Sequence, residues 1–195
     1  MRRLILWLIP AATAIALFTG ISIFDSVRKQ AELDRDTSTP DFTSYSEGIN
    51  TVFYDLEGRI NYTIQARRQI QYKDDSTEFE KPYIRLFQNG DPRWNIVANS
   101  GRISADQAGN TSAARKIDLE GNVEVYSLDE FGNRMIMSTE FLSVDPELET
   151  LQTDHPVSIV TNTVKQSSVG MFADLKLDEI VFNRDSRGSY EYTAQ

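Results

Sequence analysis

A single uncharged stretch near the start of the sequence divides the chain into two parts with different surroundings. Residues 4–24 carry no charge, and as a helix rising 1.5 Å per residue they would reach about 31 Å. The hydrocarbon core of a bilayer is about 30 Å thick, so this length predicts one membrane crossing. Arg2 and Arg3 precede the stretch and the first acidic residue, Asp25, follows it. This asymmetry places the N-terminus in the cytoplasm and the rest of the chain across the membrane.

A cleaved signal peptide is the alternative interpretation of the same stretch. A charged start, an apolar run and small residues are typical of secretory signals. However, the apolar residues continue past Ala16 through Leu17, Phe18 and Ile21, and no polar cleavage region follows the alanines. We therefore favour an uncleaved anchor, and either interpretation exports the remainder of the chain.

The exported part is strongly acidic. The whole chain carries 20 Lys and Arg against 29 Asp and Glu, a net charge of −9, and without Arg2 and Arg3 the remainder carries 18 against 29, or −11. This charge argues against nucleic acid as a partner and against binding to anionic headgroups through a basic face. The chain has no cysteine and one histidine, which leaves no basis for a thiolate or zinc site.

The residues after the anchor indicate a linker and then a folded domain. Residues 36–46 are rich in Ser, Thr and Asp around Pro40, a composition typical of linkers. We expect residues 1–24 to form a cytoplasmic tip and transmembrane anchor, residues 25–48 a helical extension and linker, and residues 49–195 an exported β domain.

Within this domain the apolar residues recur with a period of two. Every second residue is apolar in 59–67, and the same alternation recurs in 94–98, 117–125 and 157–159. Alternation of one apolar and one polar face predicts antiparallel strands. Many short strands at even spacing predict an all-β fold, either a sandwich, a jellyroll or a barrel.

Turn signals separate these strands and leave few candidates for catalysis. Asn89-Gly90, Asp145-Pro146 and Asp154–Pro156 are typical turn sequences, and His155 is expected to be a turn residue in the last of them. The glycines do not cluster into a phosphate-binding loop, and most carboxylates fall at turns or on polar faces. The sequence therefore predicts no catalytic residue, no metal site and no cofactor.

Short motifs spread over nearly the whole chain carry a family resemblance. They are Pro40-Asp41-Phe42, Tyr54–Gly58, Phe79 ahead of Pro82, Pro92–Ala98, Leu119–Val125, Leu151–Thr153, Gly170 and Tyr190-Glu191. In this order, and together with the anchor and the length, they resemble the LptC family, the single-pass inner-membrane component of lipopolysaccharide export in Gram-negative bacteria.

The resemblance implies a fold, a location and partners. It implies a twisted antiparallel β-jellyroll of two V-shaped sheets in the periplasm, preceded by one transmembrane helix. Such a protein receives lipopolysaccharide from an inner-membrane ABC transporter complex of the LptF/LptG type, which it contacts through its anchor and N-terminal edge. It passes the lipid through an apolar groove to an LptA-type periplasmic protein at its C-terminal edge. The segment 107–114 departs from the family pattern and is expected to be an expanded hairpin loop.

The resemblance also implies roles for particular residues. Phe79 and Tyr190 match family positions on the lipid path, and Gly58 and Gly170 match glycines implicated in assembly. The sequence itself predicts an apolar inward face that could hold acyl chains, because each Å² of apolar surface removed from water contributes about 25 cal/mol. Ile84, Trp94 and Ile96 are the lipid-binding candidates on this face. Its full predicted membership is Ile60, Tyr62, Ile64, Phe79, Ile84, Leu86, Trp94, Ile96, Ile117, Leu119, Val123, Val125, Met135, Met137, Leu142, Val144, Val157, Ile159, Leu175 and Leu177.

The end of the chain is the candidate docking edge. Residues 190–193 alternate aromatic and polar side chains, including Tyr192, and an open strand edge can accept a strand from another protein. Two other functions stay open from the sequence. One is a membrane-anchored periplasmic scaffold that binds strand edges without carrying lipid, and the other is an exported carbohydrate-active β-sandwich.

Overall fold

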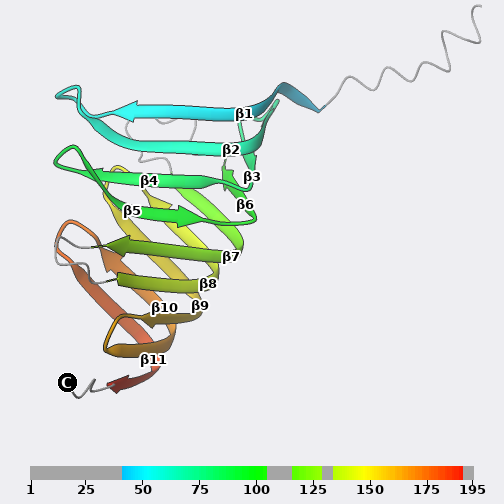
Figure 1. The fold of residues 1–195 in the computed structure, drawn as a ribbon. Coiled ribbons are helices and arrows are strands. Elements are labelled where there is room, and N and C mark those ends of the chain that lie inside the picture. Colours follow the sequence, from blue (N-terminus) through cyan, green and yellow to red (C-terminus); the bar gives the residue numbers. More distant parts are fainter. Residues whose placement is uncertain (1–40, 105–115, 129–133, 191–195) are drawn as a thin grey trace, which may run out of the picture. The chain divides into compact units, whose positions relative to one another are not determined.

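The computed structural model describes residues 41–104, 116–128 and 134–190, and every regular element in them is a β-strand. All pairings between these strands are antiparallel, so the expected all-β antiparallel domain is confirmed. The predicted anchor at 4–24 and loop at 107–114 lie outside the described residues. Among the residues that are described, no helix is long and apolar enough to cross a membrane. The strands are β1 (Phe42–Tyr54), β2 (Ile60–Tyr72), β3 (Thr77–Glu80), β4 (Tyr83–Gln88), β5 (Asp91–Val97), β6 (Ser100–Ile103), β7 (Ile117–Leu128), β8 (Arg134–Asp145), β9 (Thr150–Val160), β10 (Val164–Asp174) and β11 (Glu179–Tyr190) (Figure 1).

The first strand begins earlier in the chain than the domain start expected near Ile49. β1 starts at Phe42, and Tyr45 already lies opposite Ile70 of β2. The polar composition of its first residues resembles a linker because β1 is an edge strand with most of its side chains exposed. Ile49 and Phe53 are partly buried and pack against the core, which ties the strand to the domain.

The eleven strands form one hydrogen-bonded sheet that forks and rejoins. β1 lies at one edge beside β2, and β11 lies at the other edge beside β10. β2 pairs with β4 through residues 62–65 and with β3 through residues 68–71. β7 pairs with β6 through residues 118–120 and with β5 through residues 124–127. The branches β4–β5 and β3–β6 therefore occupy different halves of the same long strands (Figure 1).

The long strands bend along the line where the two branches separate. The register of β7 shifts at Gly121 and Asn122, which have φ angles of +75° and +48°, and β10 is interrupted at Gly170 with φ +80°. The N–H of Asn99 donates to the carbonyl of Gly121 at 2.9 Å, joining the β5–β6 connection to this line. Such bulges sharpen the bend and twist of a strand. The bends divide the sheet into two halves. Half-sheet A comprises β4, β5 and residues 123–128, 134–139, 156–160, 164–169 and 187–190. Half-sheet B comprises β3, β6 and residues 117–120, 141–145, 150–153, 171–174 and 179–184.

One apolar core lies between the two half-sheets. Its members come from β2 to β10 and alternate along each strand with exposed or half-buried residues, as the period of two predicts. The buried core residues are Tyr62, Ile64, Ala66, Phe79, Ile84, Leu86, Trp94, Ile96, Ala98, Ile117, Leu119, Val123, Val125, Met137, Leu142, Val144, Leu151, Val157, Ile159, Met171, Ala173 and Leu175.

Two expectations from the sequence are wrong. The alternation predicts that Leu177 faces inward, but β10 ends at Asp174 and Leu177 lies in the following turn with 70% of its surface exposed. The Asp-His-Pro sequence predicts a turn at His155, but this residue lies within β9, where the strand bends without reversing. Its exposed ring packs against Phe141, with the ring centroids 5.5 Å apart.

Candidate functional site

Four of the five residues predicted to bind lipid lie together in the core. Ile84 and Ile96 are opposite each other on β4 and β5, and Trp94 is opposite Leu86 on the same pair of strands. Phe79 joins this cluster from β3, which belongs to half-sheet B. The structure therefore brings these four side chains into one apolar interior that both half-sheets line.

The fifth residue, Tyr190, lies away from this interior. It ends β11 opposite Val164, and 62% of its surface is exposed. Tyr192, the predicted docking residue, lies outside the described residues. The edge strands themselves are β1 and β11, and Phe53 anchors β1 by stacking on Tyr62 with the ring centroids 4.3 Å apart.

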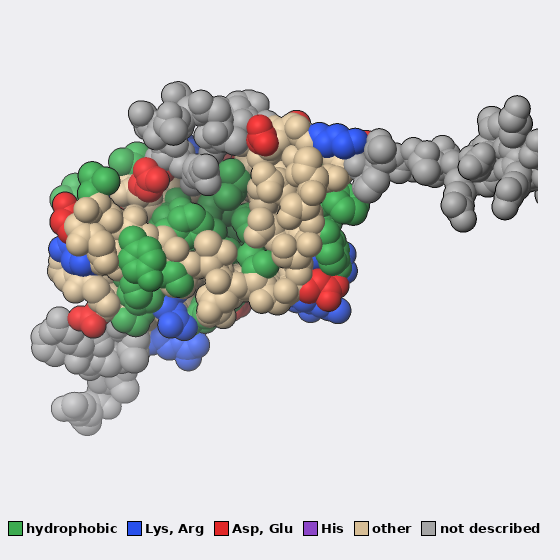
Figure 2. Space-filling view, turned by 90° about the horizontal axis from the view of Figure 1, so that it is seen from above, with side chains coloured by type: hydrophobic (Ala, Val, Ile, Leu, Met, Phe, Trp, Pro, Cys, Tyr) green, Lys and Arg blue, Asp and Glu red, His purple; other side chains and the backbone are tan. Residues whose placement is uncertain are grey.

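The interior is filled by the side chains of the chain itself. Ile84, Ile96, Leu119 and Val125 are fully buried, and none of five pockets found among the described residues is lined mainly by core side chains. Figure 2 views the β1 end of the domain and shows hydrophobic side chains gathered near the middle of that face. An acyl chain would have to separate the half-sheets or displace these side chains in order to lie between them.

A pocket of about 280 Å³, which we call the mouth pocket, lies between one end of half-sheet A and one end of half-sheet B. Trp94 and Met135 line it from half-sheet A, and Leu175 and Ile180 line it from the β10–β11 hairpin of half-sheet B. Trp94 and Leu175 belong to the core, and Met135 and Ile180 pack against it. The mouth pocket therefore borders the apolar interior.

An ion pair lies at the rim of the mouth pocket. Nη2 of Arg93 on β5 donates to both carboxylate oxygens of Asp178 in the β10–β11 turn, at 2.8 and 3.0 Å. The other terminal nitrogen of Arg93 donates to Oε1 of Gln88 on β4. Behind this pair, Nε1 of Trp94 is buried and has no hydrogen-bond partner among the residues that the structure describes. No local sequence signal could predict this pair, because its members are 85 residues apart.

The turn between β8 and β9 carries a partly buried carboxylate, that of Glu149. Lys176 Nζ lies 3.8 Å from Oε1 of Glu149 and donates to the carbonyl of Glu147 at 3.0 Å. Burial raises the pKa of Glu149, Lys176 opposes this rise, and the nearby carboxylate of Asp174 adds to it. Glu149 and Lys176 line a separate pocket of about 250 Å³ beside the β4–β5 turn.

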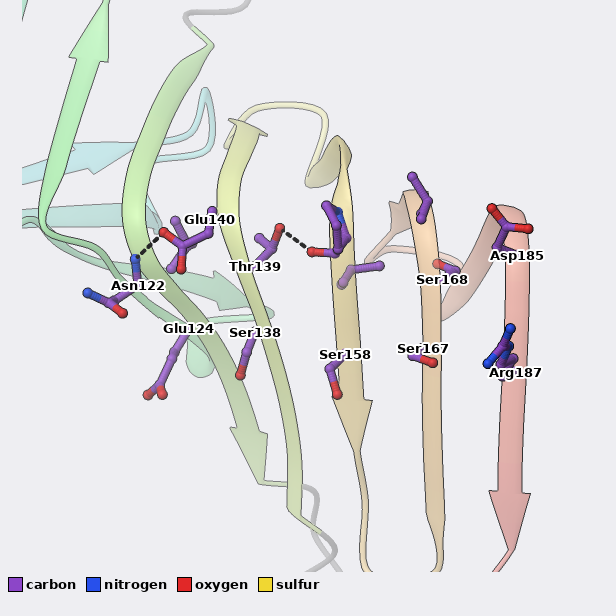
Figure 3. A pocket seen from close by; sticks show the side chains of 14 residues that line it. Asn122, Glu124, Ser138, Thr139, Glu140, Ser158, Ser167, Ser168, Asp185 and Arg187 are labelled. Atoms are coloured by element: carbon purple, nitrogen blue, oxygen red, sulfur yellow. Dashed lines mark hydrogen bonds between the residues drawn. The ribbon is translucent and has the colours of Figure 1, made fainter.

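A groove of about 700 Å³, lined by both polar and apolar residues, crosses β7 to β11 (Figure 3). Glu124, Ser138 and Ser158 line it and alternate along their strands with core residues, and Arg187 lines it from the exposed part of β11. Its lining also includes the apolar side chains of Val123, Pro156, Val157 and Val169. No group of three or more His, Asp or Glu side chains that could hold a metal ion occurs in the part of the chain that the structure describes.

The two glycines predicted to serve in assembly both occupy left-handed backbone. Gly58 has φ +80° in the β1–β2 turn, where its N–H donates to the carbonyl of Asp55 at 3.0 Å. Gly170 has φ +80° at the bend of β10, with Asn183 of β11 directly against it. L-residues with a side chain rarely adopt this conformation, so both positions require glycine for the backbone itself.

Comparison with known proteins gives one consistent result. A family model described as "Lipopolysaccharide-assembly, LptC-related" matches residues 8–191. The chain is 22% identical over 186 residues to the lipopolysaccharide export system protein LptC of Escherichia coli K12. The alignment covers 94% of this chain and 92% of that protein. The LptC proteins of Escherichia coli O157:H7 and Shigella flexneri match with the same identity and coverage.

Proposed function

Because the chain belongs to the LptC family of lipopolysaccharide-assembly proteins, we propose that it carries lipopolysaccharide from the inner membrane toward the outer membrane. The E. coli relatives are named as lipopolysaccharide export proteins, and this chain has the same role in export. In this proposal the acyl chains travel through the interior between half-sheets A and B, and an ABC transporter supplies the energy. The protein is a transport component, and no catalytic role is proposed.

The apolar interior is the observation that carries this proposal. Phe79, Ile84, Trp94 and Ile96 lie in one cluster that both half-sheets line. Each methylene that an acyl chain buries there contributes about 0.8 kcal/mol, so several chains supply affinity without a charged contact. The headgroup and its phosphates stay outside, since the exported part of the chain carries a net charge of −11.

The closed core requires that the domain opens to load lipid. We infer that half-sheets A and B are the two sheets of a twisted, V-shaped jellyroll and that the angle between them widens when acyl chains enter. The bends at Gly121 and Gly170 support this inference because they lie where the two half-sheets meet.

The two free edges are the proposed partner sites. A strand at a sheet edge presents unpaired N–H and C=O groups that another strand can bind. We assign the β1 edge and the anchor to the inner-membrane transporter subunits of the LptF/LptG type, and the β11 edge with Tyr192 to an LptA-type periplasmic protein. Residues 4–24 form the single transmembrane anchor in this proposal, with the N-terminus in the cytoplasm and the β domain in the periplasm.

A membrane-anchored scaffold that binds strand edges without carrying lipid is the second candidate. The filled core favours this alternative, because the interior between the half-sheets is occupied by fully buried residues such as Ile84 and Ile96.

Photocrosslinking from paired positions separates the two candidates. Phe79 faces the core and the preceding residue, Glu78, faces outward on β3. A photoreactive phenylalanine analogue replaces each residue in the full chain in cells that export lipopolysaccharide. The carrier function predicts lipid adducts from position 79 and few from position 78. Adducts at neither position, with both variants folded, would leave the scaffold function.

A further inference from the structure

The Arg93–Asp178 ion pair differs from other ion pairs of the domain in what it connects. Arg68–Glu80 and Arg102–Glu78 join strands that are hydrogen-bonded neighbours. Arg93 and Asp178 join half-sheet A to the β10–β11 turn of half-sheet B, and β5 and β10 are not neighbours in the sheet. This pair therefore spans the two half-sheets directly.

The Arg93–Asp178 contact is well defined in geometry but can be broken at little cost. Gln88 holds the guanidinium of Arg93 from the adjacent strand, and the bidentate contact then fixes Asp178, whose φ is +55°. Both side chains remain exposed, by 38% and 57%, and an ion pair so exposed contributes little to stability. Separating the two residues is accordingly a small change for the domain.

The mouth pocket lies beside this pair, and each half-sheet contributes apolar side chains to its lining. Met135 of half-sheet A and Ile180 of half-sheet B both line it, and the lining residue Trp94 also belongs to the core. In the closed arrangement, no described residue accepts a hydrogen bond from the buried Nε1–H of Trp94. Opening the mouth exposes this donor to water or to an oxygen of the entering lipid, which removes an unsatisfied group.

We propose that the Arg93–Asp178 ion pair is a latch across the mouth pocket, and that acyl chains enter the interior between Trp94 and Ile180 when it opens. The proposal rests on the lipid-carrying function proposed above and adds the entrance and its control. The pair holds the unloaded interior closed to water. The latch releases when the two half-sheets separate at the β10–β11 turn.

The absence of cysteine from the sequence permits a direct test in the full chain, purified in detergent. Arg93→Cys with Asp178→Cys is joined by a short bis-methanethiosulfonate crosslinker, which forms a reducible disulfide with each cysteine, releases methanesulfinate and holds the mouth closed. Glu78→Cys with Arg102→Cys, joined in the same way, is the matched control, because this exposed pair connects neighbouring strands. Asp178→Asn removes the ionic contact with little change in shape.

Loading is measured as the rate at which fluorescein-labelled lipopolysaccharide binds, by fluorescence polarisation. The crosslinked mouth should slow loading at least tenfold, with recovery after reduction, and the crosslinked control should load at the wild-type rate. Asp178→Asn should load about 1.5- to 5-fold faster, the range that an exposed ion pair allows. Equal loading by the crosslinked mouth and the control would overturn the latch and leave the carrier function intact. Failure of the wild-type chain itself to load lipid would overturn both.

Discussion

Replacing Gly170 by alanine tests why this glycine is required. A left-handed backbone costs a residue with a side chain about 1–2 kcal/mol. The new Cβ would also lie 2.6 Å from Nδ2 and 3.1 Å from Cβ of Asn183, and overpacking of this kind costs about 1–3 kcal/mol. We therefore expect Gly170→Ala to lower the free energy of unfolding by about 2–5 kcal/mol.

Gly58 provides the matched control for this substitution. It has the same φ of +80°, but a Cβ there meets no atom within 4 Å, so Gly58→Ala should lose only the backbone cost of about 1–2 kcal/mol. In a domain of this size each kcal/mol shifts the melting temperature by about 2–4 °C. Thermal unfolding followed by circular dichroism can separate the two variants.

A second substitution isolates the contact with Asn183. Asn183→Ala removes the amide nearest to the new Cβ, so the double variant should recover part of the stability that Gly170→Ala loses. As an exposed residue, Asn183 should change stability by no more than about 0.5 kcal/mol when replaced alone. Equal losses for Gly58→Ala and Gly170→Ala, or no recovery in the double variant, would refute the packing argument.

Three further predictions concern the core and two carboxylates. Ile84→Ala should lower the free energy of unfolding by about 2–5 kcal/mol and Leu177→Ala by no more than about 0.5 kcal/mol, and similar losses in urea titrations would contradict their buried and exposed placement. The backbone N–H of Arg59 is the main cause that lowers the pKa of Asp55 below its ordinary value of 3.8. The ionised Asp55 carboxylate therefore stabilises the folded domain fully above pH 3.8, and this stabilisation is lost as the pH falls through the pKa of the folded state. When the free energy of unfolding is measured against pH, Asp55→Asn should abolish this loss. Burial raises the pKa of Glu149 above 4.5, so stability falls as the pH rises from 4.5 through the folded value. Glu149→Gln should unfold at higher urea than wild type at neutral pH, and an advantage that persists below pH 4.5 would contradict burial as the cause.

The alternation of apolar residues predicts both the fold class and most of the core, because the period of a strand is local. Ile84, Trp94 and Ile96 face inward for this reason. The prediction of buried residues fails where a bulge reverses which positions of a strand face the core. The bend at Gly170 shifts the alternation in β10, which conceals Met171 as a core residue.

Turn chemistry and long-range contacts are harder to predict from the sequence. Asp-His-Pro is typical of a turn, yet around His155 the strand continues because β8 and β10 pair with it on both sides of the bend. The Arg93–Asp178 pair has no local signature at all, since the twist of the sheet brings its members together. The mouth pocket is therefore a finding of the structure alone.

The bends in the long strands have a consequence for how the backbone exchanges hydrogen with solvent. Gly121, Gly170 and Asp185 lie in left-handed backbone where the ladders of β7, β10 and β11 are interrupted. Amides in the regular ladders on either side are bonded to neighbouring strands and should exchange slowly. Amides at the interrupted positions should exchange fast and form a line between two slowly exchanging half-sheets. The half-sheets can change their angle along this line while the hydrogen bonds within each of them stay intact.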